Sequence, residues 1–329
     1  MPLGRVTKSA VNAALVGDTR SVAAVAVVYD QPEAEIDVWI RGIRAMKGGP
    51  YPVWLAVTKP GRALRCVGDD VAVIPLERNV GWTGGANAAA LEAMRSGCQT
   101  LVFLNTDVHF ASDELLARLV GALHSRPDVA FVSPLITTFP DTTRAWYRGA
   151  RYSARTWITR HPGIGARFNA TDQLLETSMP SGCCMAVRGE VFAELGGFDE
   201  ELFGYFDEAD LAYRARRSGW RAALLDAPLL AHRHRKRELT AVSAFYFGRN
   251  PLLLSRKHAG LLGWALAACA AFAASPYYLA RCEGRDARWA YVRGVSAGMA
   301  HVCGRPHTGE GHGAGRPRWF APSSESRAR

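Results

Sequence analysis

The feature that most limits what this chain can fold into is a regular alternation of short apolar runs with helix-like segments between residues 21 and 136. Valine and leucine are frequent in five of these runs, as expected for strands buried on both faces: SVAAVAVVYD (21–30), YPVWLAV (51–57), VAVIPL (71–76), TLVFLNTDV (100–108) and VAFVSPLI (129–136). Helical spacing, alanine content or a capping residue (Ser112) predicts helices over residues 33–46, 84–97 and 112–125. Strands that alternate with helices predict an α/β fold, with a mostly parallel sheet covered by helices on both faces.

The composition of the 329-residue chain is that of a globular protein, with 48% hydrophobic and 21% charged residues. The formal net charge of +10 favours an anionic partner: a phosphate-bearing substrate, a membrane surface or nucleic acid. Lysines and arginines are spread among acids without a long basic run, so no nucleic-acid partner is expected. The seven cysteines include no C-x-x-C motif, which indicates reduced thiols in a cytoplasmic protein rather than a zinc site or a disulfide framework.

Four regions are expected along the chain. Residues 1–20 form an N-terminal lead-in that is too polar for a signal peptide. Residues 21–258 form the main α/β domain, in which segment 137–180 is either a loop or small insertion over the site or a variable surface excursion. Residues 259–303 form a C-terminal helical segment, and residues 304–329, rich in glycine, proline, serine and arginine, are expected to be disordered.

The C-terminal helical segment contains a stretch of 21 residues without charge, GLLGWALAACAAFAASPYYLA (260–280), which is long enough to cross a bilayer. Its alanines, its glycines and Pro276 make its insertion energy marginal. Basic and aromatic residues lie at its ends, as they do at membrane interfaces: Arg256, Lys257, Trp264, Tyr277, Tyr278, Arg281 and Arg285. The first interpretation is a helix on the membrane surface, and the alternatives, in order, are a packed C-terminal helix and a membrane span.

Three polar turns follow apolar strands and are candidates for a binding site: after Val28, at 77–87 and at 105–107. The stretch NVGWTGGAN (79–87) leads into a helix start, where glycines let backbone amides approach an anion; the alternative is a plain strand-to-helix turn. It is neither a G-x-G-x-x-G fingerprint nor a Walker loop. Asp107 ends the strand LVFLNTDV and is placed either to hold Mg²⁺ or Mn²⁺ or to cap a turn. His232 or His234, at the end of a later strand, can share such an ion with Asp107.

The stretch GYFDEADLAYRARRSGW (204–220) places three acids within four positions. In a structural interpretation, Asp207 caps a helix that Gly219 ends, Glu208 and Asp210 occupy the first turn, and Asp210 pairs with Arg214. In a functional interpretation, an acid at this helix start faces a cleft and removes a proton from an acceptor hydroxyl. The two interpretations are compatible, because one acid can hold the helix while another reacts.

Taken in order, these stretches resemble the family 2 glycosyltransferases, which are inverting enzymes of GT-A fold, and they are most similar to the bacterial rhamnosyltransferase-like branch. The resemblance covers about residues 22 to 306. It is carried by NVGWTGGAN, FLNTDV, GGFDEELFGYFDEADLAYRARRSGW, AHRH, FYFGRNPLLLSRKHAG (245–260) and YVRGVSAGMAHVCGRP. It implies that residues 21–258 are a GT-A catalytic domain that moves a sugar from a nucleotide-diphosphate sugar to an acceptor hydroxyl.

The resemblance also implies roles for individual residues. Glu208 or Asp207 is expected to be the general base, with Asp210 orienting the base or receiving acceptor hydroxyls, and Asp107 and His232 are expected to bind Mg²⁺ or Mn²⁺ on the diphosphate. The acceptor side is expected at Gly182, Tyr205, Arg249 and Asn250. The nucleotide sugar is expected to contact Val28, Tyr29, Thr58, Asn79, Gly81, Trp82, Gly85, Asn87, Asn105, Thr106 and Asp107.

One departure from the family pattern bears on the donor. The second strand of the family usually ends V-D-N-x-S, with the aspartate reading the nucleotide base, whereas this chain has Thr58 and Lys59 there. Two hypotheses follow: an inverting transferase acting on a saccharide, lipid-linked or natural-product acceptor, or a non-catalytic nucleotide-sugar-binding or membrane-docking module with a degenerate site. The expected location is the cytoplasm, with peripheral contact to the inner face of the cell membrane.

Overall fold

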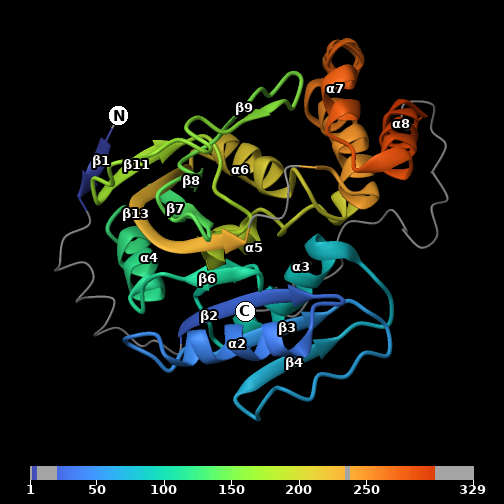
Figure 1. Ribbon diagram of the computed structural model, residues 1–329. Helices are drawn as coiled ribbons and strands as arrows, with labels where there is room; N and C mark the ends of the chain where they lie inside the picture. The colour runs from blue at the N-terminus through green and yellow to red at the C-terminus, as the bar shows by residue number, and fades with distance from the viewer. Residues whose placement is uncertain (1, 6–20, 234–237, 301–329) are drawn as a thin grey trace, which may run out of the picture.

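The computed structural model describes residues 2–5, 21–233 and 238–300, and its centre is an 11-stranded sheet (Figure 1). The strands are β1 (Pro2–Arg5), β2 (Val22–Val28), β3 (Val53–Val57), β4 (Val71–Pro75), β5 (Thr100–Leu104), β6 (Val108–Phe110), β7 (Val129–Phe139), β8 (Ala145–Tyr147), β11 (Gln173–Thr177), β12 (Cys184–Arg188) and β13 (Arg221–Arg233). A separate two-stranded sheet joins β9 (Arg151–Tyr152) to β10 (Thr159–Arg160). The helices are α2 (Glu33–Arg44), α3 (Gly81–Arg95), α4 (Leu115–His124), α5 (Gly189–Glu194), the 3₁₀ helix η2 (Glu200–Leu202), α6 (Asp207–Arg217), α7 (Ala241–Ala280) and α8 (Gly284–Ala300).

The sheet is mostly parallel, as predicted. Its order is β1-β11-β13-β7-β12-β5-β2-β3-β4, with β6 on β13 and β8 on β7. The pairs β5·β2, β2·β3, β3·β4 and β13·β7 are parallel, and β12 is antiparallel to both β5 and β7. Strands β4, β3, β2, β5, β7 and β13 therefore run in one direction, so their carboxyl ends lie along one edge of the sheet.

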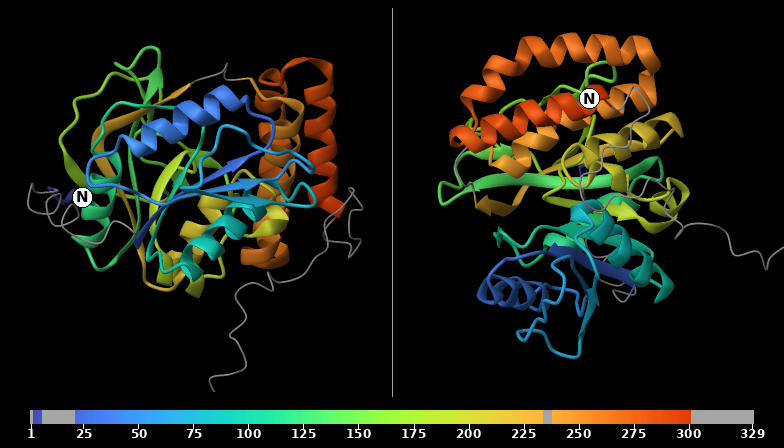
Figure 2. Two further views of the ribbon diagram at one scale, coloured as in Figure 1. Left: turned by 90° about the horizontal axis from the view of Figure 1, so that it is seen from below. Right: turned by 90° about the vertical axis from the view of Figure 1, so that its right-hand side faces the viewer.

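Helices cover both faces of this sheet (Figure 2). On one face, α2 and α4 contribute Trp39, Ile40, Leu116 and Leu119 to the larger hydrophobic core. On the other face, α3 and α5 contribute alanines and Phe192 to a second core around Phe103. Alternating strands and helices thus bury the sheet between two apolar layers, as the sequence pattern requires.

Several local predictions differ from the structure. Helix α3 begins at Gly81 rather than Gly84. Helix α4 begins at Leu115 rather than after Ser112, because the Ser112 hydroxyl accepts a hydrogen bond from the Glu114 amide in the preceding turn (3.1 Å) and does not cap the helix. Asp207 is the first helical residue of α6, and Phe206, with φ of 66°, occupies the cap position predicted for Asp207. Segment 137–180 is not a bare loop, since it carries β8 to β11.

The structure adds two details at the ends of the chain. Residues 2–5 form β1, which pairs with β11, whereas residues 6–20, the tail at 304–329 and His234 lie outside the described residues. The C-terminal helices begin at Ala241, before the expected boundary at 259. Helix α7 breaks at Gly260 (φ 66°, ψ −160°) into two halves, and among the described helices it is the one long and apolar enough to cross a membrane.

Candidate active site

Asp107 and His232 meet at the carboxyl edge of the sheet, as predicted. The chain turns between β5 and β6, where the Asn105 amide donates to the Cys183 carbonyl (2.9 Å), and β6 then pairs with β13 so that Val108 lies opposite His232. This register places Oδ2 of Asp107 3.4 Å from Nε2 of His232.

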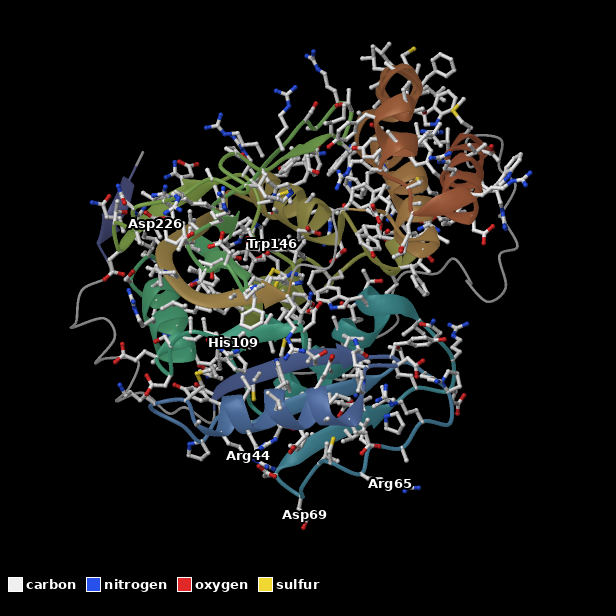
Figure 3. All side chains as sticks on the ribbon, in the orientation of Figure 1. Arg44, Arg65, Asp69, His109, Trp146 and Asp226 are labelled. Carbon is white, nitrogen blue, oxygen red and sulfur yellow. The ribbon has the colours of Figure 1, made fainter. Side chains whose placement is uncertain are left out.

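The imidazole of His232 is held by stacking. The ring of Trp146 on β8, which is labelled in Figure 3, lies 4.3 Å from it between centroids at an interplanar angle of 23°. Among the described residues, Nδ1 of His232 is buried and has no hydrogen-bond partner, which is a costly state for a ring nitrogen. The ring is therefore fixed by packing, with Nε2 turned toward Asp107.

The Asp107–His232 pair fits a cation that phosphate and water also hold. Carboxylate oxygen and imidazole nitrogen suit Mn²⁺, and carboxylate oxygen suits Mg²⁺, which keeps several non-protein ligands when it binds phosphates. No group of three or more His, Cys, Asp or Glu side chains positioned for a metal occurs within the described residues. The donor set is thus too small for a structural metal and adequate for a substrate-borne one.

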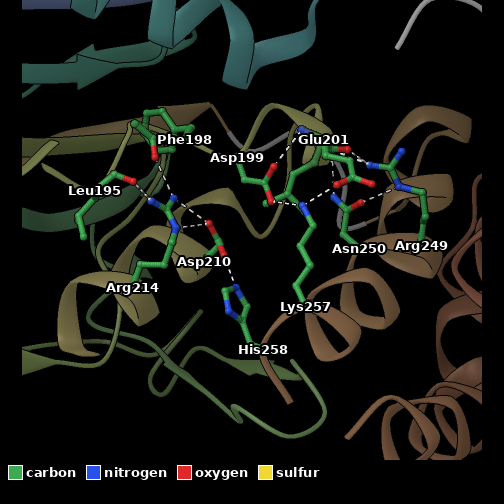
Figure 4. Close-up of polar contacts among 12 residues, drawn as sticks. Leu195, Phe198, Asp199, Glu201, Asp210, Arg214, Arg249, Asn250, Lys257 and His258 are labelled. Atoms are coloured by element: carbon green, nitrogen blue, oxygen red, sulfur yellow. Dashed lines mark hydrogen bonds and ion pairs between the residues drawn. The ribbon is translucent and has the colours of Figure 1, made fainter. Parts of the chain in front are cut away.

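Asp210 is tied into an ion-pair network at the start of α6. Its carboxylate accepts hydrogen bonds from Nε of Arg214 (2.8 Å) and from Nε2 of His258 on α7 (2.7 Å) (Figure 4). Burial raises the pKa of Asp210, but the hydrogen bond from His258 and the charge of Arg214 outweigh burial, so the pKa lies below its usual value. The predicted Asp210–Arg214 pair is confirmed, and Asp210 is a charged anchor for the helix at neutral pH.

The pKa values of Asp207 and Glu208 are shifted in the opposite direction to that of Asp210. Burial raises the pKa of both carboxyl groups, and the neighbouring charge of Glu208 raises that of Asp207 further. Asp207 is buried, whereas Glu208 is half-buried and lies against Gly182, where an added Cβ would be 3.7 Å from Cδ of Glu208. A carboxylate with a raised pKa that reaches the surface is suited to accept a proton.

The segment Gly182–Cys183 lies beside Glu208 at Gly182 and beside the turn that leads to Asp107 at Cys183, whose carbonyl accepts the Asn105 amide. Gly182 faces the Glu208 carboxyl group, and the charge of Asp107 adds to burial in raising the pKa of the Cys183 thiol. Tyr205 also lies near both acid groups: partial burial raises the pKa of its hydroxyl, and the charges of Asp207 and Asp107 add to this effect. Gly182, predicted on the acceptor side, therefore lies beside Glu208, and Tyr205, predicted on the same side, lies near Asp207 and Asp107.

Arg249 and Asn250, predicted on the acceptor side, hold the loop before α6. The loop is strained, with positive φ at Phe203, Tyr205 and Phe206. The fully buried Asn250 amide donates to the carbonyls of Leu202 (3.2 Å), Gly204 (2.9 Å) and Tyr205 (2.9 Å). Arg249 donates to the carbonyls of Glu201 and Leu202, and Lys257 pairs with Asp199 and Glu201 (Figure 4). These side chains position the loop that carries Asp207 and Glu208.

The glycine-rich stretch also binds this loop, and its first amides donate to groups of the protein. The Gly81 amide donates to Oδ1 of Asn79 (3.0 Å), and the amides of Trp82 and Thr83 donate to the carbonyl of Phe203 (2.8 and 3.3 Å). At Gly81, where φ is +72°, an added Cβ would lie 2.2 Å from that carbonyl oxygen. The first amides of α3 are therefore used inside the protein, and only glycine fits position 81.

Three other residues predicted to contact the donor make packing contacts. The Asn87 amide donates to the Phe198 carbonyl and to Glu200, while its oxygen accepts the Phe198 amide (2.9 Å). Trp82 meets Phe198 edge to face at 4.9 Å. Gly85 lets α3 approach the sheet, since a Cβ there would lie 2.8 Å from Thr58 and from Val27. Their contacts connect α3 to the acid loop and to β2 and β3.

The ends of β2 and β3 form the edge where the base-reading aspartate is missing. The buried Thr58 donates its hydroxyl to the Val28 carbonyl (3.3 Å), and Arg62 donates to the Tyr29 carbonyl (2.6 Å). Lys59 pairs with Asp30 at 2.5 Å. Thr58 therefore points into the protein. The carboxylate at this edge belongs to Asp30, which follows the end of β2. Asn105 and Thr106 lie in the turn that precedes Asp107.

The sequence reasoning did not assign Trp146, Tyr147 or His258. Tyr147 donates its buried hydroxyl to the Met179 carbonyl (2.8 Å), and the charge of Glu208 adds to burial in raising its pKa. His258 ends the R-K-H part of the motif at 245–260, which offered a signal, whereas Trp146 lies in segment 137–180, where the sequence pattern offered none.

Comparison with known proteins gives one family match. The model of a family described as glycosyltransferase like family 2 matches residues 62–247. The low-salt glycan biosynthesis hexosyltransferase Agl10 of Haloferax volcanii is 24% identical over 156 residues, which cover 46% of this chain and 48% of the relative. The N-acetylglucosaminyl-diphospho-decaprenol L-rhamnosyltransferase of Mycobacterium tuberculosis is 36% identical over 52 residues, which cover 16% of this chain and 17% of the relative. The matched part thus spans about half the length of the first relative and less of the second.

A solved structure has the same architecture. The crystal structure of GalNAc-T7 with UDP, GalNAc and Mn²⁺ aligns with a TM-score of 0.51 at 15% sequence identity, covering 65% of this chain and 43% of that chain. At this identity the likeness concerns the fold alone, and it agrees with the mixed α/β sheet of GT-A type that the sequence predicts.

Proposed function

Since this chain belongs to the glycosyltransferase like family 2, we propose that it transfers a sugar from a nucleotide-diphosphate sugar to an acceptor hydroxyl, with inversion at the anomeric carbon. The observation that carries the proposal is that the Gly182–Cys183 segment lies beside Glu208 at its first residue and beside the turn that leads to Asp107 at its second. This arrangement supports a donor diphosphate on the Asp107 side and an acceptor on the Glu208 side.

Glu208 is the proposed general base. Its carboxylate takes the proton from the acceptor hydroxyl while that oxygen bonds to the anomeric carbon, and the bond to the nucleoside diphosphate breaks on the opposite side. Direct displacement inverts the configuration and leaves no covalent intermediate on the protein. The half-buried position of Glu208 favours it over the buried Asp207, whose carboxyl group tunes the pKa of the pair.

Asp107 and His232 are the residues that would hold Mg²⁺ or Mn²⁺. The cation supplies positive charge that stabilises the diphosphate leaving group. Trp146 contributes by fixing the imidazole plane of His232, so that the ring need not be ordered when the donor binds.

The proposed setting is the cytoplasm, at the inner face of the cell membrane, with a saccharide, lipid-linked or natural-product acceptor. The printed names of the two relatives, one for glycan biosynthesis and one for a diphospho-decaprenol substrate, support a glycan or lipid-linked acceptor. The missing base-reading aspartate leaves Asp30 as the carboxylate for donor recognition at this strand edge.

The test is a donor screen. The full chain is incubated with Mn²⁺, a panel of nucleotide sugars and candidate acceptors, and release of nucleoside diphosphate is measured. We expect sugar-dependent release that falls at least about 10²-fold in Glu208→Gln and is lost in Asp107→Ala, while the exposed controls Glu190→Gln and Asp69→Ala keep full activity. NMR of the product reports the anomeric configuration.

Three results would count against this proposal or change it. Full activity in both Asp107→Ala and Glu208→Gln would remove the assigned site. Tight donor binding without turnover on any acceptor would instead favour a non-catalytic nucleotide-sugar-binding module. Loss of activity in Asp207→Asn with full activity in Glu208→Gln would assign the general base to Asp207 instead.

A further inference from the structure

The second half of α7, residues 261–280, exposes a helix face made of apolar side chains. Its largest members are Leu261, Leu262, Leu266, Phe272 and Tyr277, and Leu262 and Phe272 are 76% and 83% exposed. The smaller residues exposed between them are alanine, proline and Cys269, so no charged side chain interrupts the face. We call the exposed side of residues 261–280 the docking face. A helix facing water normally carries charges there, and an apolar patch of this length indicates a binding surface.

The rest of the chain holds the docking face outward. The first half of α7 is bound to the protein body through Arg249, Asn250, Lys257 and His258. The break at Gly260 then changes the direction of the helix. The right-hand view of Figure 2 shows the second half of α7 at the outer edge of the molecule, with α8 beneath it.

Helix α8 covers the inner side of both halves of α7. Gly294 and Gly298 allow contact with the first half, since an added Cβ would lie 2.0 Å from the Phe245 carbonyl oxygen and 2.8 Å from Cβ of Leu252, respectively. Tyr291 reaches the second half, where its hydroxyl is 3.4 Å from that of Ser275. Small residues thus lock the hairpin together, and the docking face stays uncovered by any described residue.

The exposed charge of α8, the helix that packs against α7, is mostly positive. Helix α8 exposes Arg285, Arg288 and Arg293 against a single acid, Asp286, and places the exposed Trp289 among them. Arginine and tryptophan next to an apolar helix are the composition of a surface that binds anionic lipid headgroups.

We propose that the α7–α8 hairpin docks on an anionic lipid bilayer, with the docking face in the acyl region and the arginines of α8 at the headgroups. The hairpin lies in the plane of the membrane, because a spanning α7 would carry the charged residues of the adjoining α8 into the hydrocarbon core. A second copy of the chain is a poorer partner, since a symmetric contact would bring the same arginines face to face.

Vesicle binding by the full chain tests the proposal. We expect co-sedimentation with phosphatidylcholine vesicles that contain phosphatidylglycerol, and weaker binding to phosphatidylcholine alone or at high salt. The Leu262→Ser/Phe272→Ser variant should bind at least about tenfold more weakly. The matched control is Val38→Ser, which changes a 53% exposed residue on α2 and should bind as the wild type does. Arg285→Gln/Arg288→Gln should lose the preference for anionic vesicles.

Cys269 gives a second readout, because it is the exposed cysteine among the described residues and lies on the docking face. In a Cys303→Ser background, anionic vesicles should protect Cys269 from a water-soluble maleimide, and Leu262→Ser/Phe272→Ser should abolish the protection. Circular dichroism and unchanged sugar-dependent nucleotide release would show that this variant is folded. Vesicle co-sedimentation and maleimide protection themselves do not depend on turnover.

Wild-type protein that binds neither vesicle, or that binds equally well after Leu262→Ser/Phe272→Ser, would overturn the proposal. A dimer in light scattering that this variant converts to a monomer, without vesicle binding by either protein, would assign the docking face to contact between copies instead.

Discussion

His258, two residues before the break in α7, donates a 2.7 Å hydrogen bond to Asp210 in the first turn of α6. Asp210 is 1% exposed, and its other oxygen accepts from Arg214. This contact joins the C-terminal helices to the helix start that carries Asp207 and Glu208. The helical segment beyond residue 240 is therefore part of the architecture of the site.

We expect His258→Ala to destabilise the protein by about 1.5–3 kcal/mol at pH 7, the range for a hydrogen bond to a charged group. The folded-state pKa of Asp210 lies below its unfolded value, so the stability it contributes is present above the unfolded pKa and is lost as pH falls through the folded pKa. The difference between variant and wild type in urea unfolding should shrink at about pH 3. An equal difference at both pH values would show that the hydrogen bond to the carboxylate is not the cause.

The opposite pH dependence is expected for Asp207. Its pKa and that of Glu208 are raised in the folded state, so the stability these acids contribute is present at acidic pH and lost as pH rises. Asp207→Asn removes a buried carboxylate and should unfold at a higher urea concentration than wild type at pH 8, with no gain near about pH 4. Asp69→Asn, at an exposed position, should change neither midpoint. A higher urea midpoint of Asp207→Asn at acidic pH alone would contradict the raised pKa of Asp207.

Asn250 is expected to act on turnover through the loop before α6. Asn250→Ala removes three hydrogen bonds to the loop and should cost about 1.5–4.5 kcal/mol of stability, at about 0.5–1.5 kcal/mol each. In the folded fraction, kcat should fall more than tenfold while KM for the donor stays within about twofold, because the loop carries the proposed base. The exposed Asn169→Ala serves as control. A change confined to KM of the donor would contradict a positioning role.

Two glycines should respond differently to alanine. Gly81→Ala places Cβ 2.2 Å from the Phe203 carbonyl oxygen at φ of +72°, so we expect loss of about 2–4 kcal/mol or failure to fold. Gly182→Ala meets Glu208 at an ordinary 3.7 Å and should change stability by less than about 1 kcal/mol. It narrows the space beside Glu208, so kcat/KM for the acceptor should fall. Equal thermal stability of both variants would refute the close contact at Gly81.

Metal dependence can be assigned to the Asp107–His232 pair by titration. We expect chelation to abolish transfer, Mn²⁺ to restore it, and His232→Gln to raise the Mn²⁺ concentration needed for half-maximal activity by about 10–100-fold. His109→Gln, an exposed histidine on β6, should leave the titration unchanged. Identical Mn²⁺ titrations of wild type and His232→Gln would exclude His232 as a ligand.

The parts of the fold that depend on the local hydrophobic pattern could be predicted from the sequence. The valine-rich runs became β2, β3, β4, β5 and β7, since strands buried on both faces leave a continuous apolar run. The pairing of Asp107 with His232 also followed, because both residues end strands at one edge of the sheet. Both predictions depend on the hydrophobic periodicity and on the order of strands and helices, which can be read from a single sequence.

The contacts that individual polar side chains make inside the protein could not be predicted from the sequence. Asn87, Arg249 and Asn250 have residue types that suit ligands, but in the structure their amide and guanidinium groups bind backbone carbonyls of residues 198–205. Such partners are distant in sequence, and a loop with three positive φ values exposes carbonyls that no local pattern predicts. Trp146 was missed for the same reason, since its contact with His232 arises only when β8 pairs with β7.

The carbonyl of Phe203, which accepts the first amides of α3, has a consequence for protein engineering. Residues 79–87 and 198–206 are far apart in the chain but share this oxygen and the reciprocal hydrogen bonds between Asn87 and Phe198. A chimera that imports only one of these segments from another family member leaves the other without its partners. The two segments form one transplantable unit, and grafts that change substrate choice should exchange both together.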